Sequence, residues 1–509
     1  MQRSSLLRGL RAPGVLGALT GLRALALLAL GAVPAMGQST GTGTAAGGGT
    51  YQGPITQHPL VVPATPFQWA TTSGLGPVKV PFPGQFGWTH IVGLDFQIRV
   101  VPSLSTDPTL EAILYPPASG HPTKAERITI QFPTDPDAIR GGGAMVLAFH
   151  SFGVSEKDIW VNTDLPQLCA QKGWLLVAPY GLVDTHYGNI PSQKSLDKVL
   201  ELVDAFFDWD QDRTYAVGFS MGGGAAMSYA MRHMDGKRTP IAGVINHTGT
   251  IDLLHTYQTG TPALKAMMAN QHHFGAAPGS PETNFAYERV SPATLIGGAI
   301  EPFRTRARNL SHLPLYFFSN LDDPQVDLVQ HNAALGAYLA GEGVNVNQVQ
   351  LHAGSQHAWS TLNLETAFDW LEHYKLPATP LDAAVSADNA SRYHHTYVRA
   401  KPWNRIAYYE VSADIVSSTV SVTDTRDLGS LVLHLDEMGF APRQFVGGLW
   451  SSQDGSDDRL VLTGYQGAPP SQVLFGGQPT TDWTHDPLLG EVTLYLSGGA
   501  GTVIWSVTP

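Results

Sequence analysis

Continuous apolar runs alternate with helix-like stretches through the middle of the chain. The runs are short, rich in Val, Ile, Leu and Phe, and bounded by Gly, Pro or polar residues: 145–149, 174–178, 215–217, 241–245 and 315–318. Stretches such as Ser195–Phe207 and Asp327–Leu339 lie between them and have the pattern of helices. Strands covered on both faces appear as uninterrupted apolar runs. The alternation therefore predicts an α/β protein, with a mostly parallel sheet, right-handed crossovers and helices on both faces.

The flanking regions have a different pattern. On the N-terminal side, Ile91–Ile98 and Arg127–Ile130 resemble opening antiparallel strands. An amphipathic helix is expected at about 362–374, and Pro377 and Pro380 after it mark a boundary. Short strands separated by Gly, Pro and Asp turns are then expected at 419–422, 430–435, 460–462, 491–496 and 502–507. Residues 377–509 are therefore predicted to form a C-terminal all-β, sandwich-like domain.

The first 77 residues have the pattern of a targeting segment and a linker. Three arginines in the first eleven residues precede the apolar run Ala24–Val33, and Ala35–Gly37 supplies the small residues that a signal peptidase recognises. A membrane anchor is the alternative, but the run is about half as long as a bilayer crossing requires. We expect a cleaved signal peptide at 1–37, a flexible Gly-rich linker and extension at 38–77, a secreted or periplasmic location, and no membrane attachment after cleavage.

Composition narrows the class of protein. The 509 residues are 43% hydrophobic and 14% charged, enough for two folded units, with 78–376 expected as the first. A net charge of −12 and the lack of a long basic run exclude nucleic acid as a partner. The single cysteine, Cys169, permits no internal disulfide and is expected to be a buried, inert thiol.

The strongest chemical signal is the segment Gly218-Phe219-Ser220-Met221-Gly222, directly after the buried run 215–217. A serine nucleophile must sit on a sharp strand-to-helix turn, so the residues two positions away on either side must be nearly free of side chain. The following Gly223 to Ala226 are small and open a helix, whose N-terminus directs backbone N–H groups at a forming oxyanion. We predict Ser220 as the nucleophile; an ordinary turn is the alternative.

A base and an acid are expected later in the chain, in the order serine, acid, histidine. Asp323 lies in the loop after the run 315–318 and is the preferred acid; Asp322 is its rival, and either could instead cap a helix. His357 lies in the small-residue loop Gly354–Trp359 and is the preferred base, with a surface loop histidine as the alternative.

Together these motifs give the chain a family resemblance. Residues from about 90 to 376 resemble the secreted esterase branch of the α/β-hydrolase fold, near polyhydroxyalkanoate depolymerases and feruloyl esterases. The carrying segments are Asp210–Gly223 at the nucleophile, Leu321–Val326 at the acid and His357-Ala358-Trp359 at the base. The resemblance implies an α/β-hydrolase fold, a Ser220–His357–Asp323 triad and no cofactor. The chain departs from many relatives in lacking disulfides.

The same resemblance suggests the oxyanion hole. Phe149–Gly153 ends the first buried strand, where the family usually has a His-Gly pair. The backbone N–H of Phe152 would then act with that of Met221. Ser151 stands in place of the glycine, so Ser151 is an alternative donor, and His150 is expected to be structural.

The stretch 252–309 is too long for a plain crossover and is expected to be a lid over the pocket. Its paired His272 and His273 lack the spacing of a metal site, so no metal is expected.

Three functions remain open. A carboxylic ester hydrolase acting on a small-molecule or polymeric ester is the leading hypothesis, and a serine peptidase of the oligopeptidase-like branch is the alternative. The third is a binding protein with an inactive hydrolase fold. The C-terminal domain is a candidate for holding a polymer or carbohydrate through Trp403, Trp450 and Trp483, with core packing as the alternative for these tryptophans.

Overall fold

The computed structural model describes most of the chain from Thr89 onward. The described residues are 89–90, 96–101, 109–133, 143–235, 241–401, 404–454, 458–496 and 501–509. The expected signal peptide and linker at 1–77, most of the strand expected at 91–98, and Trp403 lie outside them. Contacts divide the chain into two compact units. The first ends at Asp184 and also includes Pro191–Gln211, and the second comprises Thr185–Ile190 and Asp212–Pro509.

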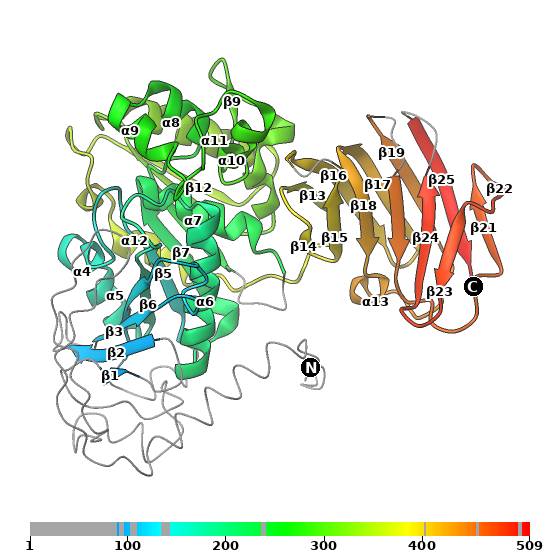
Figure 1. Cartoon of the computed structure of the whole chain (residues 1–509), viewed down its shortest axis with the longest axis horizontal. Helices are drawn as coiled ribbons and strands as arrows, with labels where there is room; N and C mark the ends of the chain where they lie inside the picture. The colour runs from blue at the N-terminus through cyan, green and yellow to red at the C-terminus, as the bar shows by residue number, and fades with distance from the viewer. Residues whose placement is uncertain are drawn as a thin grey trace, which may run out of the picture. The chain divides into compact units, whose positions relative to one another are not determined.

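Six strands of the first unit follow the order β1-β2-β3-β4-β6-β5. Figure 1 labels all of them except β4. Their bounds are β1 Thr89–His90, β2 Phe96–Val101, β3 Thr109–Leu114, β4 Glu126–Gln131, β5 Met145–Phe149 and β6 Leu175–Pro179. Neighbours from β1 to β6 pair antiparallel, whereas β5 and β6 pair in parallel with Met145 opposite Leu175. The change from antiparallel to parallel pairing is the one that the sequence pattern predicted.

Three helices of this unit connect the strands: α4 Asp158–Asn162, α5 Leu165–Lys172 and α6 Ile190–Phe206. Cys169 on α5 is buried and forms no disulfide, as predicted. Helix α6 begins five residues before the expected Ser195. Pro191 is its second residue, a position at which a missing N–H costs the helix nothing.

The α/β part of the second unit has four parallel strands in the order β7-β8-β11-β12. Their bounds are β7 Thr214–Phe219, β8 Gly243–His247, β11 Leu315–Asn320 and β12 Val346–Leu351. Every residue of β7, β8 and β11 is buried, which explains their apolar sequences. The helices here are α7 Met221–Arg232 after β7, α11 Val326–Gly341 between β11 and β12, and α12 Leu364–Leu371 after β12.

Strand β8 lies two residues later than its apolar run predicted. It ends with Asn246 and His247, two polar residues that are nevertheless buried. Asn246 Nδ2 donates to Asn332 Oδ1 (2.6 Å), and His247 bonds Thr361. Buried polar groups are tolerated where they find such partners, so the strand continues through them.

The stretch between β8 and β11, residues 252–309, is called the insertion below. It contains α8 Leu253–Thr259, α9 Pro262–Met268, α10 Pro281–Glu288, the hairpin of β9 Leu295–Ile296 and β10 Ala299–Ile300, and the 3₁₀ turns η2 Pro302–Arg304 and η3 Arg306–Leu310. Side chains cap its helices: Asp252 accepts from His255 N, Thr261 from Leu264 N, and Ser280 from Thr283 N. The insertion is thus a folded helical segment.

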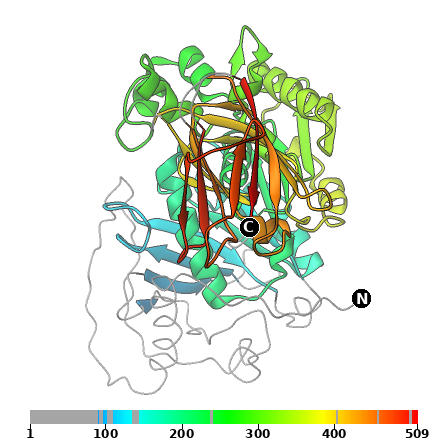
Figure 2. The ribbon, with the colours of Figure 1, turned by 90° about the vertical axis from the view of Figure 1, so that its right-hand side faces the viewer.

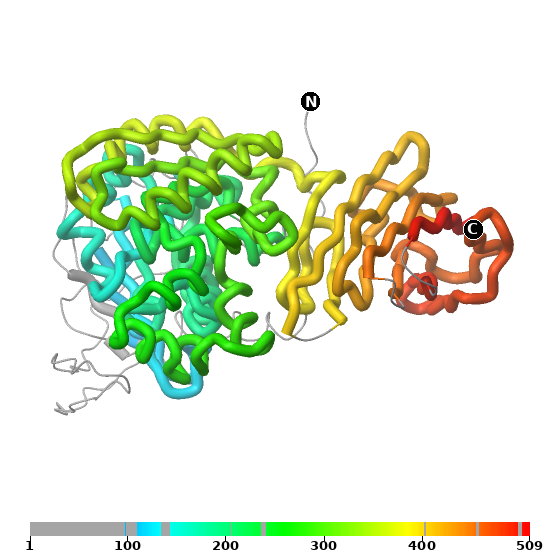
Figure 3. The backbone as a smooth tube through the Cα atoms, turned by 90° about the horizontal axis from the view of Figure 1, so that it is seen from above, coloured from blue at the N-terminus to red at the C-terminus, as the bar shows by residue number. Residues whose placement is uncertain are grey.

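From Ala383 onward the described residues are almost entirely β, as predicted (Figure 2, yellow to red). Figure 3 traces the backbone of the same segment in the same colours. One sheet has the order β13-β16-β17-β19-β25-β21-β22, and the other β14-β15-β18-β20-β24-β23. The first-sheet strands are β13 Ala383–Ala387, β16 Ala407–Asp414, β17 Thr419–Arg426, β19 Val446–Ser452, β21 Gln472–Phe475, β22 Gln478–Pro479 and β25 Gly501–Thr508. The second-sheet strands are β14 Ser391–Tyr393, β15 Thr396–Ala400, β18 Leu428–Leu433, β20 Asp458–Leu462, β23 Trp483–Asp486 and β24 Glu491–Leu496.

Pairing in these two sheets is antiparallel except at two places. Strand β17 pairs in parallel with β19, and β18 pairs in parallel with β20. Alternate residues are buried along most of the strands, which is typical of sheets covered on one face. Trp450 on β19 is only 2% exposed, so it is a core residue and not a stacking platform, whereas Trp483 on β23 is partly exposed.

The parallel strands joined by helices, the antiparallel strands ahead of them, and a serine at the turn from β7 to α7 are the features of the α/β-hydrolase fold. The predicted fold class, including the all-β C-terminal part, is confirmed. Within the described residues, no helix combines the length and the apolarity that a bilayer crossing requires.

Candidate active site

Ser220 occupies the turn at which strand β7 gives way to helix α7. Its backbone has φ 55° and ψ −122°, a region that residues other than glycine rarely adopt. The turn is held on both sides, because Ser220 N–H donates to His247 O (3.0 Å) and Ser220 O accepts from Thr250 N–H (3.0 Å). The surrounding structure therefore maintains a strained conformation that points the hydroxyl away from the sheet.

The neighbouring glycines are required by lack of space. A Cβ atom at Gly218 would collide with the backbone of Gly222, and one at Gly224 would collide with the carbonyl of Thr250. The turn can thus close only if these positions carry no side chain. This lack of space is the physical reason for the first glycine of the Gly-x-Ser-x-Gly pattern and for Gly224 after it.

Three side chains form a hydrogen-bonded row that starts at Ser220. His357 Nε2 lies 2.8 Å from Ser220 Oγ, and His357 Nδ1 lies 2.7 Å from Asp323 Oδ2. Since a carboxylate only accepts, Nδ1 of His357 carries the proton and Nε2 accepts from the serine hydroxyl. The Asp323 side chain is 1% exposed, and the His357 side chain is 22% exposed. The structure thus brings together the three residues that the sequence singled out.

Asp322, the rival acid, lies outside this row. Its Oδ1 pairs with His352 Nδ1 (2.9 Å), and its Oδ2 accepts from Gly354 N–H (3.3 Å). The hydrogen bond from His352 lowers the pKa of the Asp322 carboxyl. Because both Asp322 and His352 are exposed, this pair is a surface contact of the His357 loop.

Asn320, the last residue of β11, joins the loops that carry the acid and the base. Its Nδ2 donates to Gly354 O (2.7 Å) and Gln356 O (3.0 Å), and its Oδ1 accepts from the N–H groups of Ala353 (3.0 Å) and Asp322 (3.3 Å). The side chain is fully buried. All four hydrogen-bonding positions of the amide are occupied, which fixes both loops to one strand end. No sequence pattern had singled out Asn320.

His247 is a second residue that the sequence analysis did not identify. Its ring lies 4.5 Å from that of Phe219, which in turn lies 4.4 Å from the ring of His357. Thr361 Oγ1 donates to Ala358 O (2.9 Å), so it accepts from Nε2–H of His247 (3.0 Å). Burial, with His357 nearby, lowers the pKa of His247 to about 3. The ring is therefore neutral, and it ties strand β8 to the segment just after His357.

The predicted oxyanion-hole residues lie in different units. Met221 is the first residue of α7, so its backbone N–H has no acceptor within the helix and is available to a ligand. Phe152 belongs to the first unit, in the turn after β5, where its side chain is 45% exposed. Ser151 Oγ donates to Asp158 Oδ2 (3.4 Å), and His150 Nε2 bonds Tyr180 O (2.9 Å). The parts assigned to Phe152 and Ser151 remain predictions.

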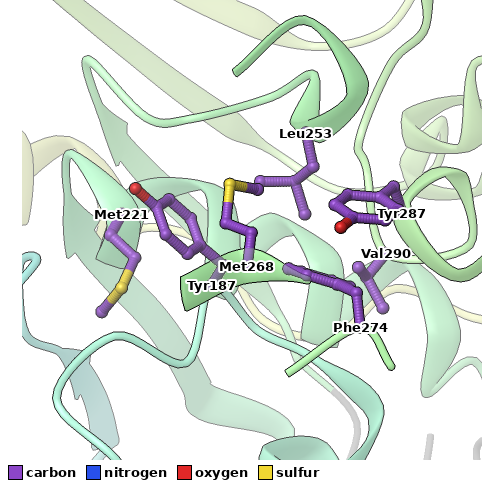
Figure 4. Packing of buried hydrophobic residues seen from close by; sticks show 7 residues of the cluster. All are labelled: Tyr187, Met221, Leu253, Met268, Phe274, Tyr287 and Val290. Atoms are coloured by element: carbon purple, nitrogen blue, oxygen red, sulfur yellow. The ribbon is translucent and has the colours of Figure 1, made fainter. Parts of the chain in front are cut away.

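A buried apolar cluster connects the insertion to the nucleophile turn. It consists of Tyr187, Met221, Leu253, Met268, Phe274, Tyr287 and Val290 (Figure 4). Met221 follows Ser220 directly. The five residues from Leu253 to Val290 belong to the insertion, and Tyr187 comes from the segment between β6 and α6. Hydrogen bonds from Thr185 to His273 (2.9 Å) and from Asn189 to His272 (3.3 Å) strengthen the contact. The insertion thus packs against the residue that follows the nucleophile, and its role as a lid stays a prediction.

The two histidines considered as metal ligands have other roles here. His273 Nε2 bonds the hydroxyl of Thr185, and the backbone O of His272 accepts from Asn189. Among the residues with described positions, no group of three or more His, Cys, Asp or Glu side chains could hold a metal ion.

No family model and no curated protein matches the sequence. Solved structures match about half of it at low identity. FphF, a fluorophosphonate-binding serine hydrolase of Staphylococcus aureus, is 13% identical over 52% of this chain and 99% of its own, with a TM-score of 0.39. The S-formylglutathione hydrolase FrmB of the same species is 14% identical over 53% and 98%, with a TM-score of 0.37.

A ferulic acid esterase is 13% identical over 55% of this chain and 99% of its own, with a TM-score of 0.38. All three TM-scores are below 0.5. The α/β-hydrolase fold of this chain therefore rests on the strand order and on the turn at Ser220.

Proposed function

We propose that this chain is a serine hydrolase that cleaves carboxylic esters through an acyl-enzyme formed on Ser220. The observation that carries the proposal is the row Ser220–His357–Asp323, with 2.8 Å and 2.7 Å between its hydrogen-bonding atoms, at a strained strand-to-helix turn. A serine hydroxyl is a weak nucleophile until an adjacent base takes its proton, and this row supplies that base already oriented.

The first half of the reaction forms the acyl-enzyme. Ser220 Oγ attacks the ester carbonyl while its proton passes to His357 Nε2. Asp323 holds the proton on Nδ1 and stabilises the imidazolium that results. The backbone N–H of Met221 donates to the oxyanion, with Phe152 or Ser151 proposed as the second donor. His357 then gives its proton to the departing alkoxide, and the alcohol leaves.

The second half repeats these steps with water. His357 Nε2 takes a proton from a water molecule as the water oxygen attacks the acyl carbonyl. Collapse of the intermediate breaks the bond to Ser220 Oγ, which regains the proton from His357, and the carboxylic acid leaves. No metal or cofactor takes part in the proposed cycle.

A serine peptidase acting through the same residues is the alternative, because the same row can attack an amide. We propose the ester as substrate, in keeping with the sequence resemblance, and leave open whether it is small or polymeric. We also propose export of the chain, on the basis of its first 37 residues.

The experiment compares a p-nitrophenyl ester series with a peptide p-nitroanilide series. We expect turnover of short-chain esters to dominate, and Ser220→Ala and His357→Ala each to lower kcat by roughly 10⁴-fold. Dominant cleavage of the anilides would favour the peptidase. Full ester turnover by purified Ser220→Ala protein would exclude the proposed mechanism.

A further inference from the structure

The C-terminal strands contact the insertion at several points, all within the second unit. The first is ionic. Asp388, just after β13, pairs with Arg289 at the end of α10 (3.0 Å) and with Arg306 in η3 (2.7 Å), and also with Arg232 at the end of α7 (2.9 Å). The side chains of Asp388 and Arg306 are completely buried. Burial alone would raise the pKa of Asp388, but the three arginines hold that pKa well below its usual range.

The second contact is aromatic. The guanidinium of Arg426 on β17 lies 3.5 Å from the ring centre of Phe303 in η2, and the ring of Tyr408 on β16 lies 5.3 Å from it. One aromatic side chain of the insertion therefore contacts two neighbouring C-terminal strands. A cation over an aromatic face is attracted by the ring quadrupole, and more strongly where water is excluded.

In the third contact, one side chain of the insertion forms two hydrogen bonds with the backbone of a C-terminal strand. Asn309, in η3, accepts from Ser386 N–H (2.7 Å) and donates to Ser386 O (3.0 Å). It also donates to Met231 O (2.9 Å) in α7. Since Ser386 belongs to β13, the insertion bonds the edge of the C-terminal sheet as another strand would.

Short bonds within the insertion join the segments that make these contacts. Arg304 pairs with Glu288, Ala307 N–H donates to Pro292 O (2.8 Å), and Ala293 N–H donates to Ile251 O (3.1 Å). Tyr287 and Val290, which lie on either side of Glu288 and Arg289 in the chain, belong to the apolar cluster with Met221 and Tyr187. A continuous set of contacts thus leads from the C-terminal strands to the residue after Ser220.

We propose that the C-terminal domain is a clamp for the insertion, holding it in the position in which its apolar cluster packs against Met221 and Tyr187. The partner that this surface fits is the chain's own insertion. The inference concerns the role of the domain and stands on contacts alone, so it holds whether the substrate is an ester or an amide.

The test is amide hydrogen exchange of the full-length protein, measured by mass spectrometry, with a matched pair of variants. Arg426→Ala removes the guanidinium over Phe303. Arg459→Ala removes one that lies 5.7 Å from the ring centre of Tyr495, within the C-terminal domain. We expect Arg426→Ala to speed exchange of the amides in 253–288 roughly tenfold, because local opening becomes easier, and Arg459→Ala to leave them unchanged.

Phe303→Ala tests the same contact from the other side. Its effect on exchange in 253–288 should match that of Arg426→Ala, and the double variant should add little more. Unchanged exchange in 253–288 in both single variants would overturn the proposal, as would faster exchange confined to 383–509. Because exchange is measured without substrate, an outcome against the clamp is separate from an outcome against the proposed hydrolysis.

Discussion

His247 Nε2 lies 3.0 Å from Thr361 Oγ1, joining two residues that are 114 positions apart in the chain. The hydroxyl of Thr361 in turn donates a hydrogen bond to Ala358 O, the carbonyl of the residue directly after His357. The other ring nitrogen, Nδ1, is buried without a hydrogen-bond partner. A buried acceptor without a partner destabilises the folded protein. The Nδ1 atom of His247 therefore lowers the free energy of unfolding relative to an apolar residue at this position.

The first prediction follows from this pair. His247→Phe and Thr361→Val should each lower kcat roughly tenfold with KM nearly unchanged, because the His357 imidazole loses part of its support. The double variant should cost little more than either single one, and His247→Gln, which keeps an N–H donor, should recover much of the loss. Steady-state kinetics on a soluble ester measures all four. Additive losses in the double variant would show that His247 and Thr361 do not act on His357 through one shared contact. The control is Thr425→Val, at a buried threonine of the C-terminal domain.

Much of the site could be predicted because its signals are local. The strand, the glycines and the following helix that position Ser220 all lie between Thr214 and Arg232, and each has its own sequence pattern. His357 and Asp323 follow from their places after strands β12 and β11. The choice of Asp323 over Asp322 as the acid depends on which side chain is buried beside His357. The sequence alone does not show which of the two side chains is buried.

Asn320, His247 and Asp388 could not be predicted because their partners are distant in sequence. Asn320 forms hydrogen bonds with residues more than 30 positions away in the sequence. Asp388 pairs with Arg232, which is 156 positions away. The same reason explains the missed strands. β14, with the sequence Ser-Arg-Tyr, has no apolar alternation of its own and is defined only by pairing with β15.

The second prediction concerns Asn320. Replacing it by Asp leaves the shape but removes the two N–H donors to Gly354 O and Gln356 O, and places a carboxylate in a buried site. We expect kcat to fall roughly 10²-fold, since small misplacements of a catalytic group have effects of this size. Gln348→Glu, at another amide that donates to a backbone carbonyl, is the control. Equal kcat values for wild type and Asn320→Asp would show that the loops hold their positions without this amide.

The third prediction is a loss of stability in mild acid. Burial lowers the pKa of His312 to about 4, and it lowers that of His394, whose ring lies 4.7 Å from His312, well below its usual value. The groups facing this pair are His395 and the Asn309 backbone. Between pH 6.5 and about 4 the unfolded chain binds protons that the folded protein does not, so stability falls as the pH falls.

The slope should be about 1.4 kcal/mol per pH unit for each such histidine. Chemical denaturation at a series of pH values measures it. His312→Gln should flatten the acid side of the profile, whereas His272→Gln, at a partly exposed position, should not. An unchanged slope in His312→Gln would mean that this histidine does not titrate differently on folding.

The fourth prediction concerns Asp388. Asp388→Asn leaves three arginines facing a neutral amide, and breaking a buried ion pair from one side typically costs about 3–5 kcal/mol. The expected result is a much lower Tm or insoluble protein. Asp424→Asn, which removes a partly exposed partner of Arg426, should change stability by less than about 1 kcal/mol. Similar Tm values for the two variants would show that the buried pairs contribute no more than a surface pair.

The most direct test of the proposed nucleophile is labelling with a fluorophosphonate, followed by mapping of the modified peptide by mass spectrometry. The predicted result is one adduct, on Ser220, formed quickly by the wild type, very slowly by His357→Ala and not at all by Ser220→Ala. Folded wild-type protein that stays unlabelled, or an adduct on a different serine, would contradict the account.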